Sequence, residues 1–500
     1  MGICTTYFEK YGFHTGCAKI RWELYCSMRM ITVLKEKYEG FSAPVKASFW
    51  ALFCSVFQSA ASLVTTPIFT RVLTQEEYGI YSQYSSWLAL LSILVTLNLS
   101  YETYMKGLSD YSEEEGAFTA SMLWLNIAVF SGFLLVFLIA PSFWASVFHL
   151  SPLLSGLMFV HLFVSNPFDY WKSRERYHYR YRLSTLLSIA LTVFSYAFSI
   201  YAVTHYADRL NLRIEADLLA RVLIGLPLLV VLLRKTKYIY HKEIWRYALT
   251  FSLPLIPHYL SNIILNQSDR LMIGRLVGDA EAGKYSIAYM IASMVLMIIS
   301  AIDNSYVPYT FQKLTEKDSA AMRKSSSYLL AGVALLCVIA MGLAPEVIQI
   351  AAGESYRDAA VIVPSVSASV YFIFVYNLFA NVEYHYKETK MVGFATLIGA
   401  VLNVVLNWVL IPIAGYTVAG TTTLVSYLFL AVFHYFCYRH IQKVYGCEAV
   451  YDMRYLFLIS TALLAVTGLI RFIFGYIVIR LILVAIIVPA AGYLLLKKRI

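Results

Sequence analysis

The stretch Arg71-Val-Leu-Thr-Gln-Glu-Glu-Tyr-Gly-Ile-Tyr-Ser82 returns later in the chain as Arg275-Leu-Val-Gly-Asp-Ala-Glu-Ala-Gly-Lys-Tyr-Ser286. Arg, Glu, Gly, Tyr and Ser coincide between the two stretches at one constant offset of 204 residues. Self-similarity at a fixed period indicates a duplicated structural unit. We therefore interpret the chain as two related halves.

The composition of the 500 residues indicates that lipid is the main solvent of these halves. Hydrophobic residues make up 59% and charged residues only 14%, against roughly 25% charged residues in soluble domains. A membrane-spanning helix needs about 20 mostly apolar residues, and the chain offers about 14 such stretches. We predict an all-α integral membrane protein with spans near 46–69, 80–105, 117–140, 151–171, 183–205, 216–233, 246–273, 284–308, 327–349, 361–382, 391–413, 416–438, 454–474 and 476–496.

The repeat offset spans an even number of these helices, so both copies enter the membrane in the same direction. Parallel repeats of this kind are typical of transporters. We expect two pseudo-symmetric six-helix bundles, 46–240 and 241–440, around a central cleft. Residues 441–500 would add a helix pair, and 1–45 a cytoplasmic segment whose true start we place at Met28 or Met30 as a hypothesis.

The net charge of +10 is explained by topology rather than by nucleic acid. Most Lys and Arg residues fall in alternate loops, the richest being the run from Lys172 to Arg182. Basic loops stay on the cytoplasmic side, so we predict both termini in the cytoplasm of a bacterial inner membrane. No nucleophile motif, cofactor motif or metal-ligand cluster is present in the sequence, so we expect neither an enzyme nor a cofactor.

Polar residues inside predicted spans are the candidates for function, because they are costly in lipid and usually face a cavity. His258, Asn262, Asn266 and then Asp269 or Arg270 recur at helical spacing and form one stripe. Pro254 and Pro257 should bend the same helix. The alternative is that these amides join helices by hydrogen bonds, and that Asp269 and Arg270 form a structural ion pair or an end cap.

Three motifs resemble a known family. They are Thr66-Pro-Ile-Phe-Thr-Arg71, Gln267-Ser-Asp-Arg-Leu-Met-Ile-Gly274 and Asn403-Val-Val-Leu-Asn407. In these motifs the chain is similar to the Wzx-type polysaccharide flippases of the multidrug/oligosaccharidyl-lipid/polysaccharide exporter superfamily. The resemblance implies movement of an undecaprenyl-diphosphate-linked oligosaccharide across the membrane by alternating access, for surface polysaccharide synthesis. It also implies a polysaccharide polymerase or glycosyltransferases as partners.

Such a cargo needs cations for its diphosphate and polar groups for its glycan. Our candidate cargo-binding residues are Arg71, Arg221, Arg270, Arg275, His258, Asn262, Asn266, Asn403 and Asn407. Glu102, Asp269 and Asp303 are candidates for coupling transport to an ion gradient. The alternatives are a drug or cation antiporter of the same superfamily, a peptidoglycan-precursor flippase and a membrane enzyme.

Overall fold

The computed structural model describes residues 39–40, 42–234 and 240–497. Within these residues every regular element is a helix, which confirms the predicted all-α class. The proposed start at Met28 or Met30 lies outside the described residues. The first half of the described chain contains α3 (Ala43–Val72), α4 (Gln75–Thr96), α5 (Glu102–Asp110), η1 (Ser112–Glu114), α6 (Glu115–Ile139), α7 (Pro141–Phe148), α8 (Pro152–Tyr177), α9 (Tyr181–His205) and α10 (Arg209–Leu233).

The second half begins after residues 235–239. It contains α11 (Lys242–Ser252), η2 (Leu253–Leu255), α12 (Ile256–Leu276), α13 (Asp279–Glu316), α14 (Ser319–Gly342), α15 (Ala344–Ala352), η3 (Glu354–Ile362), α16 (Val363–His385), α17 (Thr389–Ala414), η4 (Tyr416–Val418), α18 (Ala419–Tyr445), α19 (Met453–Phe472) and α20 (Ile477–Lys497). The predicted interruption at Pro254 is present, because η2 separates α11 from α12.

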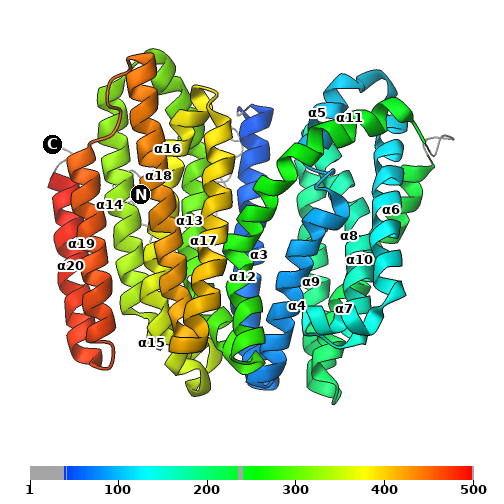
Figure 1. Ribbon diagram of the computed structural model, residues 1–500, viewed down its shortest axis with the longest axis horizontal. Coiled ribbons are helices and arrows are strands. Elements are labelled where there is room, and N and C mark those ends of the chain that lie inside the picture. The colour runs from blue at the N-terminus through cyan, green and yellow to red at the C-terminus, as the bar shows by residue number, and fades with distance from the viewer. Residues whose placement is uncertain (1–38, 41, 235–239, 498–500) are drawn as a thin grey trace, which may run out of the picture.

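Helix contacts fall into two sets that meet mainly at α4 (Figure 1). In the first half, α8 packs on α6 and α10, and α9 packs on α3 and α10. In the second half, α16 packs on α13, α14 and α18, and α17 packs on α12 and α18. Helix α4 packs on both α12 and α13. We keep two six-helix bundles as our interpretation of these contacts.

All predicted spans fall on helices, but fewer than 14 of the described helices are long and apolar enough to cross a membrane. By length and composition, 11 helices of the described chain can cross a membrane, or 12 if the bent pair α7 and α8 is one span. Helix α4 is not among them, since it places Ser82, Gln83 and Ser86 in its buried face. Helix α20 contributes the shorter apolar helix Ile477–Ala490 to the part of the chain that could be assessed for spans. The number of 14 therefore stays a prediction.

The repeat is visible where α4 crosses α13. Ser82 and Ser286, which are 204 residues apart, hydrogen-bond to each other through their side chains. A two-fold axis that relates the two halves brings a residue close to the axis next to its equivalent in the other half. An axis between α4 and α13 would therefore produce the contact between Ser82 and Ser286. Both helices also start alike, with a Glu at the third position, and Glu77 and Thr74 cap α4 reciprocally.

The two halves differ in how deeply their helices are buried. In the most apolar stretch of the span Glu354–His385, 89% of the residues are buried. In the corresponding stretch of Val45–Val72, none is buried. Helix α16 is thus the centre of a packed second half, and α3 lies at the margin of the first. This asymmetry leaves room beside α3 for a cavity.

Candidate functional site

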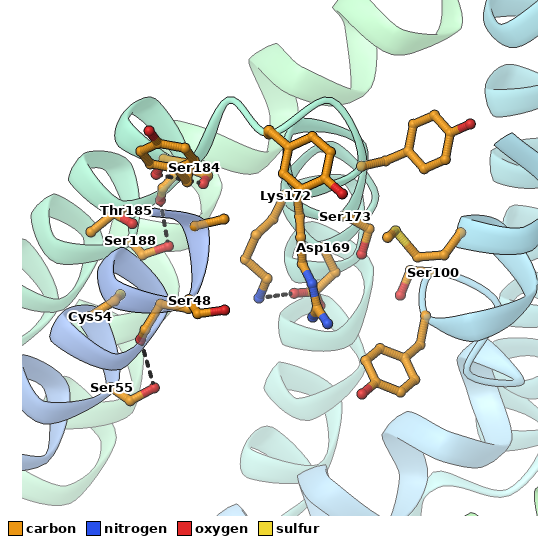
Figure 2. Close-up of a pocket in the computed structure, with 18 of the residues that line it drawn as sticks. Ser48, Cys54, Ser55, Ser100, Asp169, Lys172, Ser173, Ser184, Thr185 and Ser188 are labelled. Atoms are coloured by element: carbon orange, nitrogen blue, oxygen red, sulfur yellow. Dashed lines mark hydrogen bonds and ion pairs between the residues drawn. The ribbon is translucent and has the colours of Figure 1, made fainter. Parts of the chain in front are cut away.

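A polar cavity of about 1250 Å³ lies between α3, α8, α9 and the α4–α5 linker (Figure 2). It lies where α8 ends and α9 begins, beside the run of basic residues from Lys172 to Arg182. We call this end of the molecule the basic end. Helices α7 and α15 lie at the other end (Figure 1), which we call the opposite end.

Helix α8 contributes every charged side chain of the cavity. Its lining residues recur every three or four positions and so share one helical face: Asp169, Lys172, Ser173, Arg176 and Tyr177. Lys172 Nζ donates to Asp169 Oδ1 at 3.0 Å. The side chain of Arg176 is exposed and has no hydrogen bond or ion pair with any residue that the structure describes. The cavity therefore carries one free cation beside one ion pair.

Helices α3 and α9 form the facing wall with small and hydroxyl side chains. The same helical spacing selects Ala47, Ser48, Ala51, Cys54, Ser55 and Gln58 on α3, and Tyr181, Ser184, Thr185 and Ser188 on α9. Gln58 Nε2 donates to Thr192 Oγ1 at 3.3 Å, which ties the two helices together. Small residues allow the helices to approach closely, and their hydroxyl groups give the wall a polar surface.

The α4–α5 linker closes a third side. Leu97 and Asn98 both have φ near 50°, in the left-handed region, which Asn tolerates better than most residues. This turn ends α4 and directs Asn98, Ser100 and Tyr101 to the cavity. Of the described residues of the second half, Asn304 of α13 alone lines the cavity. The site thus belongs almost entirely to the first half.

The chemistry of this lining suits an anion attached to a polyhydroxylated group. Cationic side chains bind phosphate by charge-assisted hydrogen bonds. Hydroxyl and amide groups can both donate and accept hydrogen bonds, as sugar hydroxyls require. Among the described residues Asp169 is the one carboxylate that lines the cavity, and Lys172 already pairs with it. A cationic ligand would find no free carboxylate among the lining residues.

None of the candidate site residues from the sequence lines this cavity. The stripe on α12 exists as one chain of contacts: Asn262 Nδ2 lies 3.4 Å from His258 Nε2, and Asn266 Nδ2 donates to Asn262 O at 2.8 Å. Arg270 continues it by donating to Asn266 O, and its guanidinium lies 4.5 Å from the Tyr289 ring. The stripe faces the junction of α12 with α13, and through Gln267 with α4, where Ser86 donates to Gln267.

Asp269 does not belong to this stripe. Its side chain lies inside the second half, with 1% of its surface exposed. It accepts hydrogen bonds from Asn407 at 2.6 Å, from Thr423 at 2.7 Å and from Tyr285. Asn403 accepts from Ser268, and both Asn403 and Asn407 have no exposed surface. This arrangement joins α12, α13, α17 and α18, which matches the alternative that the amides connect helices.

The remaining candidates lie apart from one another. Arg221 pairs with Asp217 one turn earlier on α10, at 3.0 Å. Glu102 accepts from the Tyr259 hydroxyl, and Asp303 accepts from Asn377 at 3.1 Å. Arg71 and Arg275 lie at the opposite end, where each donates to a backbone carbonyl. The structure therefore does not gather the predicted residues into one site.

Lys172 and Arg176 are not among the site residues that the sequence predicts. The basic run that contains them predicts only the orientation of the chain in the membrane. The additional signal was the spacing, because Asp169, Lys172 and Arg176 fall on one helical face. Charged residues that only orient a chain in the membrane do not need to lie on one face of a helix.

An all-helical chain with many apolar helices, two related halves and a polar cavity at one end has the features of a multi-pass membrane protein. The model of the family described as "Polysaccharide biosynthesis protein" matches residues 45–314, more than half of the chain. The chain therefore belongs to the polysaccharide biosynthesis protein family. A second model, MatE, matches residues 254–409.

Individual proteins agree with this assignment. The chain is 23% identical over 364 residues to "Lsg locus putative protein 1" of Haemophilus influenzae, a match that covers 68% of this chain and 84% of that protein. Its fold is similar to the "Lipid II flippase MurJ, inward closed conformation", with a TM-score of 0.63, 15% identity, and 90% and 99% of the two chains covered.

A multidrug resistance MATE family transporter of the MOP superfamily, solved in an inward-facing conformation, has a TM-score of 0.60 at 12% identity, with 77% of this chain and 95% of that chain covered. Both solved structures thus share the fold of this chain, and the family assignment rests on the match over residues 45–314.

Proposed function

We propose that the protein is a Wzx-type flippase that moves a polyprenyl-diphosphate-linked oligosaccharide, built on undecaprenyl, across the bacterial cytoplasmic membrane. The observation that carries the proposal is the cavity lining, in which Lys172 and Arg176 stand beside a wall of hydroxyl and amide groups. The family assignment supports a lipid-linked glycan as cargo. The lipid tail of such a cargo remains in the bilayer.

In this proposal the basic end faces the cytoplasm, as the positive-inside rule requires. The cavity then stands open to the leaflet in which lipid-linked oligosaccharides are assembled. Arg176 binds the diphosphate, because its guanidinium has no partner among the described residues and can form a bidentate contact with phosphate. Lys172 adds a second cation once Asp169 releases it. Hydroxyl groups of α3 and α9 contact the sugars.

The residues retained from the sequence have different roles in this proposal. The stripe from His258 to Arg270 lines the path that becomes accessible when α12 and α4 separate. Asn403, Asn407 and Asp269 hold the second half together. A drug or cation antiporter is disfavoured, because Asp169, the one carboxylate that the described residues bring to the cavity, is paired with Lys172.

The test is a deletion strain in which surface polysaccharide is scored and lipid-linked oligosaccharide is measured on each face of the membrane. The deletion should trap the intermediate on the cytoplasmic face, and the intact gene should release it. The variant Lys172→Gln with Arg176→Gln should fail to release it. Arg180→Gln is the matched control, since Arg180 belongs to the same basic run but does not line the cavity.

Three other outcomes would each reject a part of the proposal. Equal rescue by the double variant and by Arg180→Gln would remove the cavity as the site while leaving the function in place. Accumulation of a peptidoglycan precursor instead of the surface glycan would change the cargo. Normal polysaccharide with increased sensitivity to cationic drugs would reject flipping altogether.

A further inference from the structure

The opposite end is closed by two hydrogen bonds that the repeat relates to each other. Arg71 Nη2 of the first half donates to the Ile350 carbonyl of the second half at 3.3 Å. Arg275 Nη1 of the second half donates to the Ser146 carbonyl of the first half at 2.9 Å. The two donors are 204 residues apart, and so are the two acceptors.

Both acceptors lie in the last turn of a short helix. Ser146 belongs to α7 and Ile350 to α15, and these helices start at the equivalent dipeptides Ala140-Pro141 and Ala344-Pro345. Carbonyls of the last helical turn have no partner within the helix, and the negative end of the helix dipole favours a cation there. Each arginine therefore meets the same kind of acceptor.

A second pair of contacts starts from equivalent residues but reaches partners that are not equivalent. Gln75 and Asp279 are equivalent residues in the first turns of α4 and α13. Gln75 Nε2 donates to the Ser355 carbonyl, in η3 after α15, at 2.5 Å. Asp279 Oδ1 lies 3.9 Å from Nε2 of His149, which follows α7. The first turns of α4 and α13 therefore both contact the segment that follows the short helix of the other half.

We propose that Arg71 and Arg275 form a two-fold-related double latch that holds the opposite end shut while the cavity at the basic end is open. Opening of the opposite end requires α7 to leave Arg275 and α15 to leave Arg71. Both arginines are exposed, so water replaces the carbonyls when the latch opens, and each bond costs little to break. A latch of this strength closes the end reversibly, as alternation between two states requires.

The test uses a cysteine as a reporter of opening and does not depend on the identity of the cargo. Ala351 of α15 is 9% exposed, and its carbonyl accepts from Thr70 on α3. In Ala351→Cys the reporter is buried until the end opens. The full chain is purified into lipid nanodiscs, where a hydrophilic maleimide reaches both faces. The background cysteines to be replaced by Ser are Cys4, Cys17, Cys26, Cys54 and Cys447.

We expect Arg71→Ala and Arg275→Ala each to raise the labelling rate of the reporter about five-fold, because an exposed hydrogen bond contributes a small net free energy. The open state is the minor one, so its population and the rate rise in proportion. The double variant should reach roughly 25-fold if the bonds act independently. Arg71→Lys with Arg275→Lys should fall between the wild type and the double Ala variant.

Arg209→Ala is the matched control. Arg209 is also exposed and also donates to a carbonyl at the end of a helix, Val72 of α3, at 2.7 Å, but both residues belong to the first half. It should leave the labelling rate within about two-fold of the wild type, since no contact between the halves is lost. Cys337, which has no exposed surface, stays in the chain and reports unfolding if it is labelled.

Two results would contradict the proposed latch. One is a double variant that labels at the wild-type rate while Cys337 stays protected. The other is an Arg209→Ala variant that labels as fast as the double variant. Neither result bears on flipping of the glycan, which the deletion strain tests separately.

Discussion

Gly79 of α4 and Gly283 of α13 lie against each other, although 204 residues separate them in the chain. A Cβ atom on Gly283 would lie 3.0 Å from the Gly79 nitrogen, and one on Gly79 would lie 1.7 Å from the Asp279 carbonyl oxygen. Together with the bond between Ser82 and Ser286, this contact makes the α4–α13 crossing the tightest junction between the halves. Backbone meets backbone there, so no side chain can adjust.

The first prediction concerns that crossing. Gly79→Ala should separate α4 from α13 and destabilise the closed opposite end, at a cost of about 2–3 kcal/mol or more because an overpacked site strains its neighbours. Thermal unfolding in detergent and the labelling rate of Ala351→Cys are the measurements. Gly132→Ala on α6 is the control, since its Cβ would meet nothing within 4 Å. Equal behaviour of the two variants would contradict the tight crossing.

The second prediction concerns the cavity. Ser55→Trp fills the space between α3 and α9 and should lower flipping about ten-fold or more, because precise positioning of a ligand is lost when its site is occupied. The neighbouring Val56 is 44% exposed and does not line the cavity, so Val56→Trp is a control of equal size. Flipping is measured as lipid-linked oligosaccharide reaching the outer leaflet. A loss of the same size in both variants would indicate damage to α3 rather than blockage.

The third prediction concerns a natural probe in the same wall. Cys54 lines the cavity and is a free thiol, whereas Cys437 is 7% exposed. Maleimide should modify Cys54 and not Cys437, and undecaprenyl diphosphate should slow the reaction at Cys54. Peptide mass spectrometry of the labelled chain measures both. Unchanged labelling in the presence of saturating undecaprenyl diphosphate would remove the cavity as the diphosphate site.

The fourth prediction distinguishes a structural from a coupling role for Asp269. Asp269→Ala would leave the hydroxyl donors of Tyr285 and Thr423 unpaired in the interior and would reduce Asn407 to its bond with Asn403. Each unpaired group costs about 1–3 kcal/mol. We expect a loss of stability of about 3 kcal/mol or more. Thermal unfolding is the measurement, and Asn262→Ala, at a half-buried position of the same helix, should change it little. A stable Asp269→Ala chain that has lost its dependence on an ion gradient would favour coupling instead.

The fifth prediction concerns the appended helix α20. Arg480 is 2% exposed, pairs with Glu346 of α15 and donates to the Phe474 carbonyl at 3.1 Å. Arg480→Ala would leave Glu346 unpaired and should cost about 2 kcal/mol, less than the roughly 3–5 kcal/mol for a fully buried pair. Arg471→Ala, an exposed residue on α19, is the control, and melting in detergent is the measurement. Equal melting temperatures would show that α20 does not brace α15.

The sequence predicted the helices and the repeat well, because both depend on local patterns. Apolar length identified every long helix, and the constant offset identified Ser82 and Ser286 as equivalent residues of the two halves. The offset could not reveal that these equivalent residues touch. That depends on where the axis lies, which only packing decides.

The candidate site was predicted less well, for a physical reason. An Asn or Asp inside a span can face a cavity or another helix, and both arrangements avoid an unpaired polar group in lipid. Asn403 and Asn407 face helices here, and Lys172 faces the cavity from the end of a helix. Which side chains face water depends on how far α3 stands from α8, and no local pattern encodes that separation.

The position of Asn304 has a consequence for how a glycan would travel. Among the described residues Asn304 is the second half's whole share of the lining, so an oligosaccharide in the cavity would first rest almost entirely on the first half. The stripe on α12 belongs to the second half. A glycan that moves from the cavity along this stripe would therefore be transferred from the first half to the second during the change of access.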